Sequence, residues 1–451
     1  MIASRHNIFG KFSHSERWYL VNLLSRQADI LDTETAEAYQ RGAWGDNPAW
    51  AEKGYLVESR EEVQRYKSAY LDFLDRREKD EIQLFFVPTY ACNFACSYCY
   101  QAAYDQSQTY PSSAVLEAWF SYVDQHFAGK RKYLTLFGGE PLLNSAGQRE
   151  FVEAFLKSAD QRQLETAIVT NGYTLVDYVP LLARYRIREI QVTLDGLADV
   201  HDRRRPLKGG GSSFERIVEG ITLALHSGIA INLRMVLDRD NISELPQVAS
   251  LAIEKGWTTH PLFKTQLGRN YELHTCQAQA GALYSRVELY EDLARLIPDA
   301  PQILDFHRPA FSLSKFLWEQ GELPAPLYDS CPGTKTEWAF DASGKIFSCT
   351  ATVGKAGEEL GTFYPAVTLK QDQIEDWEER DVTSIPECQD CSLALACGGG
   401  CASVAKNQTG RVKSSDCRPV RELLSLGLEL YFPETPKTKQ EETYVDEYSR
   451  N

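Results

Sequence analysis

The chain has 451 residues, of which 43% are hydrophobic and 25% charged, a composition typical of a soluble globular protein with two or three domains. Its formal net charge of -15 argues against sequence-independent binding to a nucleic-acid backbone, which requires a positive surface. No apolar run is long enough to span a bilayer and the N-terminus does not read as a secretory signal, so we expect a cytoplasmic protein with neither nucleic acid nor membrane as a partner.

Residues 1 to 80 combine a strand pattern and a helix pattern without any visible chemistry. A strand is expected at 18–24 and a charged helix at 61–77. These elements predict a small N-terminal α+β domain that precedes the functional part of the chain.

Between residues 81 and 300, short apolar strands alternate with amphipathic helices. Strands are expected at 82–88, 133–137, 166–170, 189–194 and 229–237, with helices at 114–127, 148–158, 214–227 and 242–255. Repeated strand and helix units predict a parallel sheet with helices outside it, and five or six units rather than eight predict an incomplete barrel. Functional residues are then expected at the carboxyl ends of the strands.

Directly after the first of these strands, Cys92, Cys96 and Cys99 form a CxxxCxxC motif. Three thiolates can hold three irons of a cubane 4Fe-4S cluster, which leaves the fourth iron free to bind a reactant. The alternative is a structural zinc site, although CxxC zinc sites usually come in two facing pairs and no nearby His or Cys completes this one.

The next strand runs into a Gly-Gly-Glu-Pro turn formed by Gly138, Gly139, Glu140 and the following proline. Together with CxxxCxxC and with Tyr98 before the last cysteine, this turn resembles the radical S-adenosylmethionine (radical SAM) enzymes. The resemblance implies that the turn holds the amino group of the methionyl part of S-adenosylmethionine. Glycines allow the backbone to approach a ligand closely, and a carboxylate can balance an ammonium group.

The following two strands end at Asn171 and at Thr193 and Asp195, and an arginine cluster that includes Arg205 comes next. By the same resemblance, Thr193 and Arg205 meet the methionyl carboxylate, which arginine can bind through two parallel hydrogen bonds. Asn171 and Asp195 are candidates for cofactor hydroxyls or substrate. The alternative is that Asp195 belongs to a plain turn and that the arginines form a solvated loop.

After a bridging segment at 301–325, residues 326–432 contain seven of the eleven cysteines. Their pattern, C-x12-G-x4-C followed by CxxC-x5-C-x3-C and a last cysteine, resembles the SPASM domain, which binds two auxiliary 4Fe-4S clusters. By this resemblance the distal cluster is held by Cys388, Cys391, Cys397 and Cys417, and the proximal cluster by Cys331, Cys349 and Cys401. A pair of zinc knuckles is the alternative. Residues 433–451 form a polar tail.

Seven cysteines leave two cubanes one ligand short. Cys276, which stands alone in the sequence, is one candidate for the fourth ligand of the proximal cluster. Two other readings stay open: the proximal cluster keeps an open iron for substrate, or Cys276 is a small buried apolar residue.

These features predict an α/β protein: a partial (β/α)6 TIM-like radical SAM barrel between an N-terminal domain and an iron-sulfur SPASM domain. The resemblance implies reductive cleavage of S-adenosylmethionine to a 5'-deoxyadenosyl radical that abstracts hydrogen from a ribosomally made precursor peptide and leads to a thioether, carbon-carbon or other modification. Three 4Fe-4S clusters, S-adenosylmethionine and a reductant such as flavodoxin or ferredoxin are expected.

Three alternatives remain at this stage. The N-terminal domain either binds a leader peptide by strand addition or is a cap without a binding role. The second alternative is an anaerobic sulfatase-maturing enzyme instead of a peptide-crosslinking one. That group of enzymes has Asp directly after the second SPASM cysteine, where this chain has Thr350. The third reading is an iron-sulfur electron-transfer protein without radical chemistry.

Overall fold

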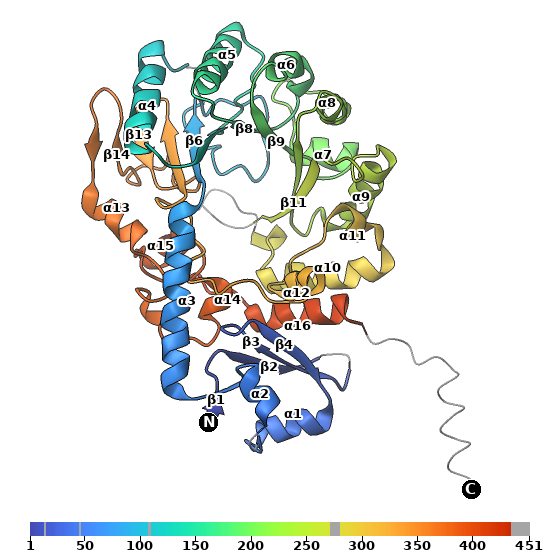
Figure 1. The fold of residues 1–451 in the computed structure, drawn as a ribbon. Helices are drawn as coiled ribbons and strands as arrows, with labels where there is room; N and C mark the ends of the chain where they lie inside the picture. Colours follow the sequence, from blue (N-terminus) through green and yellow to red (C-terminus); the bar gives the residue numbers. More distant parts are fainter. Residues whose placement is uncertain (13–14, 45–46, 107–109, 271–279, 434–451) are drawn as a thin grey trace.

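A ten-stranded sheet forms the centre of the computed structural model, which describes residues 1–12, 15–44, 47–106, 110–270 and 280–433 (Figure 1). Six of its strands are parallel neighbours in chain order: β6 (Ile82–Val87), β7 (Lys132–Leu136), β8 (Thr166–Thr170), β9 (Ile187–Thr193), β10 (Ile231–Leu237) and β11 (Phe263–Arg269). The predicted incomplete barrel of strand and helix units is confirmed. Cys276 lies outside the described residues.

Helices cover the outer face of this parallel sheet (Figure 1). They are α4 (Ser113–His126), α5 (Ala146–Gln161), α6 (Leu175–Leu182), α7 (Ala198–Arg204), α8 (Phe214–His226), α9 (Leu245–Glu254), α10 (Arg286–Asp299) and α11 (Gln302–Phe306). One apolar cluster joins the strands to them, with Leu134 and Val192 on the sheet and the fully buried Trp119 on α4. Because side chains alternate along a strand, the residues between these apolar ones face the inside of the barrel.

The C-terminal cysteine region continues the barrel sheet instead of standing apart from it. Strand β12 (Glu337–Asp341) pairs in parallel with β6, opposite Phe85 and its neighbours. Three antiparallel strands extend the sheet beyond it: β13 (Lys345–Phe347), β14 (Gly361–Thr362) and β15 (Thr368–Leu369). Short helices complete the region: α12 (Ser314–Gln320), α13 (Gln371–Glu378), α14 (Ala394–Cys397), α15 (Ala402–Thr409) and α16 (Val420–Tyr431).

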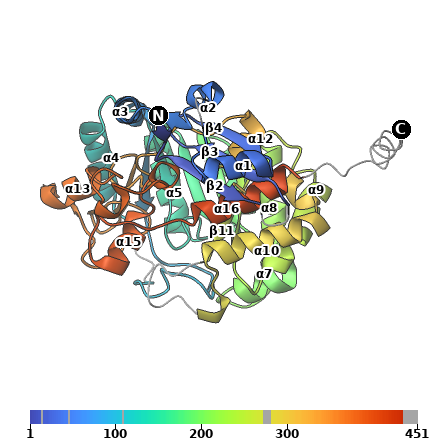
Figure 2. The same ribbon diagram turned by 90° about the horizontal axis from the view of Figure 1, so that it is seen from below.

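The N-terminal residues form a three-stranded antiparallel sheet, with β2 (Asn7–Lys11), β3 (Trp18–Asn22) and β4 (Gln27–Leu31) in that order. A smaller ladder pairs β1 (Ile2–Ala3) with β5 (Leu56–Val57). Helices α1 (Thr33–Gln40) and α2 (Pro48–Glu52) follow β4. The sheet lies against α16, as the view from below shows (Figure 2), and shares a buried apolar cluster with the C-terminal region that includes Tyr19, Cys388 and Leu424.

Helix α3 (Ser59–Lys79) runs from the N-terminal sheet past the C-terminal region to the start of β6 (Figure 1). Its acidic first turn and basic last turn complement the helix dipole. The rings of Tyr66, Tyr70 and Phe73 on α3 surround Tyr328, whose hydroxyl donates a 2.7 Å hydrogen bond to the Tyr66 carbonyl. Among the described residues, neither this helix nor any other is long and apolar enough to cross a membrane.

Replacement of Tyr328 tests this junction. Tyr328→Ala should lower the free energy of unfolding by about 3 to 5 kcal/mol, because it empties a fully buried aromatic site. Tyr328→Phe keeps the rings and loses one hydrogen bond, so it should cost about 1 kcal/mol. Circular dichroism during anaerobic thermal unfolding ranks the stabilities of the variants.

Leu71→Ala is the matched control, since Leu71 lies on the same helix with 61% of its surface exposed. Its effect should stay within about 0.5 kcal/mol. If Tyr328→Ala melts like Leu71→Ala, the aromatic cluster does not hold α3 to the C-terminal region.

Candidate functional site

The CxxxCxxC loop follows β6 and is held in place by the segment 204–208, which is distant from it in the sequence. The Ala95 and Ser97 amides donate to the carbonyls of Pro206 and Arg204, at 2.9 and 3.0 Å. The Lys208 amide donates in return to the Asn93 carbonyl at 2.8 Å. This backbone pairing brings Arg205 close to the cysteines.

The glycines of the Gly-Gly-Glu turn pack directly against the start of the cysteine loop. The Gly139 amide donates to the Thr89 carbonyl at 3.0 Å, and a Cβ atom at Gly139 would lie 2.3 Å from the carbonyl oxygens of both Tyr90 and Ala91. Gly138 has a φ of 125°, which a residue with a side chain rarely adopts. Both glycines are therefore required for the turn to reach the cysteine loop.

The Glu140 carboxylate is hydrogen-bonded at the end of β8. It accepts hydrogen bonds from the Asn171 amide at 2.6 Å and from the Thr170 hydroxyl and Leu142 amide at 2.7 Å each. Burial raises the pKa of Glu140 against the effect of these donors. The residue ties its own turn to the end of β8 in this structure, and its predicted contact with an ammonium group stays a prediction.

Tyr98 connects two other predicted residues. Its hydroxyl donates to Asp195 and accepts a hydrogen bond from the Arg205 guanidinium. The second Asp195 oxygen accepts from the Val236 amide at 2.9 Å, so this buried carboxylate also serves the end of β10. Arg204, by contrast, forms a buried ion pair with Asp238 at 2.7 Å.

A cavity of about 500 Å³ lies at the carboxyl ends of the barrel strands. The predicted barrel residues that line it are Cys92, Cys96, Tyr98, Cys99, Gly138, Gly139, Asn171, Thr193 and Arg205. Glu140 and Asp195 lie behind this lining. The cavity also includes Arg234 and Arg269, which the sequence motifs did not reveal. For Arg234 the signal in the sequence was a single cation inside the mostly apolar strand β10.

The three thiols of the loop fit a cationic metal cluster. Burial raises the pKa of Cys92 to about 12, and burial also raises the pKa values of Cys96 and Cys99, while the Arg205 charge opposes the rise in all three. Thiolates are thus stable here only with a strong positive partner such as iron. No three Cys, His, Asp or Glu side chains among the described residues converge on one metal ion, and a cubane does not require this because each thiolate binds a different iron.

The C-terminal cysteines fall into two spatial groups. Burial, and then the nearby Cys397, Cys391 and Cys417, raise the pKa of Cys388 to about 12. Burial likewise raises the pKa of Cys349, with contributions from Glu337 and from the neighbouring Cys331 and Cys401. The structure therefore brings together the same two sets of side chains that the SPASM resemblance implies, one of four cysteines and one of three, and their role as cluster ligands stays a prediction.

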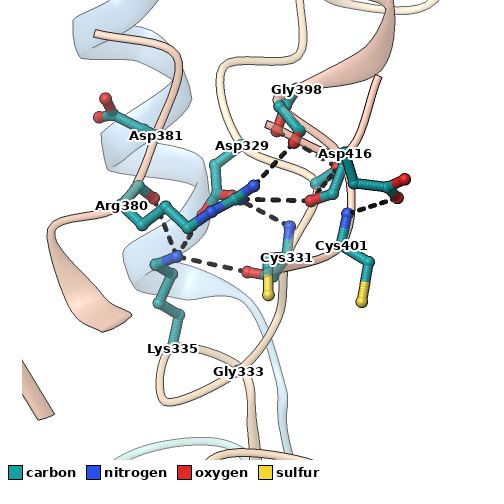
Figure 3. A network of polar contacts seen from close by, with 12 residues as sticks. Asp329, Cys331, Gly333, Lys335, Arg380, Asp381, Gly398, Cys401 and Asp416 are labelled. Carbon is teal, nitrogen blue, oxygen red and sulfur yellow. Dashed lines mark hydrogen bonds and ion pairs between the residues drawn. The ribbon is translucent and has the colours of Figure 1, made fainter. Parts of the chain in front are cut away.

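Arg380 holds the loops at 397–401 and 412–417, which carry cysteines of both groups, and Figure 3 shows it beside Cys331 and Cys401 of the group of three. Its fully buried guanidinium donates to four carbonyls on two segments, those of Gly399, Gly400, Val412 and Ser414, at 2.7 to 3.2 Å. Asp329 lies 3.7 Å from this guanidinium, pairs with Lys335, and accepts from the Cys331 amide at 3.0 Å. One ion-pair network thus joins the segments on either side of both groups.

The three glycines between Cys397 and Cys401 are needed for this arrangement. Each has a positive φ, and a Cβ atom at Gly400 would lie 2.0 Å from the Asp416 carbonyl oxygen. The Asp416 carboxylate accepts from the Cys401 amide at 3.1 Å and pairs with Arg286 at 2.9 Å. Glycine at these positions allows the chain to place two cysteines of different groups four residues apart.

Tyr100 links the barrel site to the second region. Its hydroxyl donates to the Thr350 carbonyl at 3.1 Å, directly after Cys349. The Thr350 amide donates to Glu337 at 2.8 Å, and burial raises the pKa of that carboxyl. The carboxylate beside Cys349 therefore comes from β12 and not from position 350.

Comparisons with known proteins agree with this geometry. Residues 86–252 match the Radical SAM superfamily. The chain is 26% identical over 272 residues to a probable GTP 3',8-cyclase of Sulfurisphaera tokodaii, covering 58% of this chain and 78% of that protein. It is 24% identical over 382 residues to a serine-type anaerobic sulfatase-maturating enzyme of Bacteroides thetaiotaomicron, covering 76% and 86% of the two proteins. Identity to the mycofactocin maturase MftC of Mycobacterium tuberculosis is 25% over 332 residues, with 71% and 78% covered.

Two solved structures share the fold. Native anSMEcpe with bound AdoMet superposes with a TM-score of 0.60 at 17% identity, covering 78% of this chain and 97% of that chain. Streptococcus suis SuiB bound to the precursor peptide SuiA gives a TM-score of 0.53 at 15% identity, covering 92% of this chain and 98% of that chain. At such identities the likeness concerns the fold, and for SuiB it extends over nearly the whole chain.

Gly139→Ala tests the contact between the turn and the cysteine loop. The added methyl group meets two backbone oxygens, so the loop must move and should lose its cluster. Iron content should fall from about twelve to about eight per chain, the difference of one cubane. Gly209→Ala is the control, because it adds the same methyl group where nothing lies within 4 Å, and it should keep its full iron content. A full iron content in Gly139→Ala contradicts the contact between the turn and the cysteine loop.

Arg380→Met tests the second network. Four buried carbonyls lose their donor, at about 1 to 3 kcal/mol for each group left unsatisfied, so the loops of both C-terminal groups should open. Anaerobic iron analysis is expected to give about four irons per chain instead of about twelve. The control Arg411→Met removes a cation from the same region whose side chain is 59% exposed, and should retain the metal. If Arg380→Met has the iron content and the melting temperature of the unaltered chain, Arg380 does not hold these loops.

Proposed function

The chain carries a radical SAM domain, and on this premise we propose that it is a maturase that modifies a ribosomally made peptide. The observation that carries the proposal is the single cavity in which the CxxxCxxC loop, the two glycines, Thr193 and Arg205 meet. The SPASM-type cysteine region beside it, and relatives that include the maturase MftC, support a peptide substrate.

The residues present fit S-adenosylmethionine and three 4Fe-4S clusters. In the proposal, Cys92, Cys96 and Cys99 hold the first cluster, and the groups of four and three C-terminal cysteines hold the distal and proximal clusters. Bound S-adenosylmethionine supplies a 5'-deoxyadenosyl radical that removes hydrogen from an unactivated carbon. Thr193 and Arg205 orient its carboxylate, with Tyr98 fixing the Arg205 guanidinium. Glu140 and Asp195 act by holding the strand ends.

We assign the reducing electron to a flavodoxin or ferredoxin in the cytoplasm, where thiols stay reduced. The Tyr100 and Thr350 contact places the proximal cysteine group beside the barrel cavity. This closeness supports electron exchange between the proximal cluster and a radical formed on the substrate.

We further propose that the leader of the precursor peptide adds to the edge of β4. In the described part of the chain, β4 pairs with β3 alone, whereas α16 packs beside β2 at the opposite edge. An extended peptide can supply the missing backbone partners of such an edge. Ile30 on β4 is 45% exposed and offers an apolar contact.

Maturation of a sulfatase is the second candidate, because the sulfatase-maturating relative covers 76% of this chain. The position after Cys349 does not favour it. Thr350 stands there, and the neighbouring carboxylate is Glu337, which is already bound to the Thr350 amide. We therefore rank peptide crosslinking first.

The test uses the reconstituted full chain with a strong reductant, S-adenosylmethionine, and any short precursor-like peptide found encoded beside its gene. Formation of 5'-deoxyadenosine together with a peptide mass lower by a pair of hydrogens supports the maturase. The Cys92→Ala, Cys96→Ala, Cys99→Ala variant should lose this activity and keep about eight irons, the content of two cubanes.

Three results overturn the proposal in different ways. Formylglycine in a sulfatase-derived peptide, with the precursor unchanged, assigns the chain to sulfatase maturation. Absence of 5'-deoxyadenosine with fully loaded enzyme favours an electron-transfer protein. Zinc in anaerobically purified protein excludes the cluster assignment altogether.

A further inference from the structure

Arg234 is a cation in the cavity for which the described residues provide no acceptor. It lies at the middle of β10, its Nε atom is buried without a hydrogen-bond acceptor, and its guanidinium forms no ion pair with the described residues. Arg205, by comparison, donates to Tyr98, and Arg269 donates to the Tyr284 carbonyl. The residue is half-buried, with its Nε atom shielded from water, and a shielded polar donor without an acceptor is costly, so its presence on the cavity wall indicates a ligand that supplies one.

The sheet makes room for this side chain. In the parallel ladders, Arg234 lies opposite Thr193 on β9 and opposite Gln266 on β11. A Cβ atom at residue 268 would lie 3.1 Å from the Arg234 Nε atom, and Gly268 leaves that space free. Arg234 is thus accommodated at the inner face of the barrel beside Thr193, whereas the Arg205 guanidinium reaches the cavity from the loop above.

Among the described residues, the charged side chains that line the cavity are all positive. Its lining includes the cations Arg205, Lys208, Arg234 and Arg269, and no Asp or Glu of the described residues is among them. The proposed cofactor brings one carboxylate, which is assigned to Thr193 and Arg205. Arg234 then remains for an anionic group of the second reactant.

We propose that Arg234 binds a carboxylate of the peptide substrate, so that the modified residue is an Asp or Glu or lies directly next to one. The inference rests on the proposed function and names its substrate class. Arginine is suited to this role because its two parallel N–H groups fix both the position and the orientation of a carboxylate. Such fixing would present one hydrogen of the peptide to the cofactor.

The experiment uses N-acetyl-L-glutamate methylamide and its neutral isostere N-acetyl-L-glutamine methylamide as probes. Each is titrated by calorimetry into the reconstituted full chain with S-adenosylmethionine bound. The glutamate probe should bind at least about tenfold more tightly, since the glutamine probe leaves the guanidinium without a charged acceptor. Arg234→Met should abolish this difference, and Arg234→Lys should keep part of it.

Lys255→Met is the matched control, because it removes an exposed positive charge at the end of α9, outside the cavity lining. It should bind both probes as the unaltered chain does. Iron content and melting temperature confirm that each variant folds and holds its clusters. The affinity for S-adenosylmethionine is measured in parallel and should stay within about twofold in Arg234→Met, well below the tenfold step that 1.4 kcal/mol produces.

Equal binding of the two probes by the unaltered chain overturns the inference. So does a loss of S-adenosylmethionine affinity in Arg234→Met, which would place Arg234 on the cofactor carboxylate beside Thr193. Tighter binding of GTP or inorganic phosphate than of the glutamate probe would assign the cations to a phosphorylated substrate. These measurements need no turnover, so their failure is distinct from a failure to modify the precursor peptide.

Discussion

The packing of Gly138 and Gly139 against the carbonyls of residues 89–91 is the contact on which the barrel site depends. It fixes where the cysteine loop leaves β6, and the backbone pairing with 204–208 then fixes where that loop ends. Arg205 and Tyr98 obtain their positions from the same pairing. A glycine motif that suggests ligand binding therefore also has a structural role, since a single Cβ atom would separate the Gly-Gly-Glu turn from the cysteine loop.

Burial of charge is the second constraint, and the chain meets it in two ways. Asp195, Glu140 and Asp329 are buried carboxylates that accept several hydrogen bonds each. Around Arg380 the charges are paired and four of the five guanidinium donors are used on carbonyls, which makes the network a rigid support. Arg234 differs because no acidic side chain among the described residues pairs with it, and the proposal that it binds a ligand rests on this contrast.

The continuity of the sheet connects the parts of the molecule. Strand β12 extends the barrel beyond β6, so the proximal cysteine group is held by the same sheet as the CxxxCxxC loop. The N-terminal sheet and α3 pack on the other group, around Tyr328 and Cys388. Both cysteine regions thus lie on shared hydrophobic cores, and their relative positions do not depend on a flexible linker.

The sequence alone determined the alternating strand and helix units and the family resemblance, because periodicity and motif spacing are local properties of the chain, and the grouping of cysteines followed from that resemblance. It predicted the strand at residue 18 and the helix that became α3, with ends shifted by about two residues as fraying and capping allow. It did not reveal that β12 pairs with β6, that the Glu140 carboxylate is hydrogen-bonded at the end of β8, or that Arg380 joins two loops. Nor did it distinguish Arg234 from the paired arginines. Each of these depends on which distant segments meet, and only tertiary packing decides that, since a short strand or a lone arginine carries no local mark of its partner.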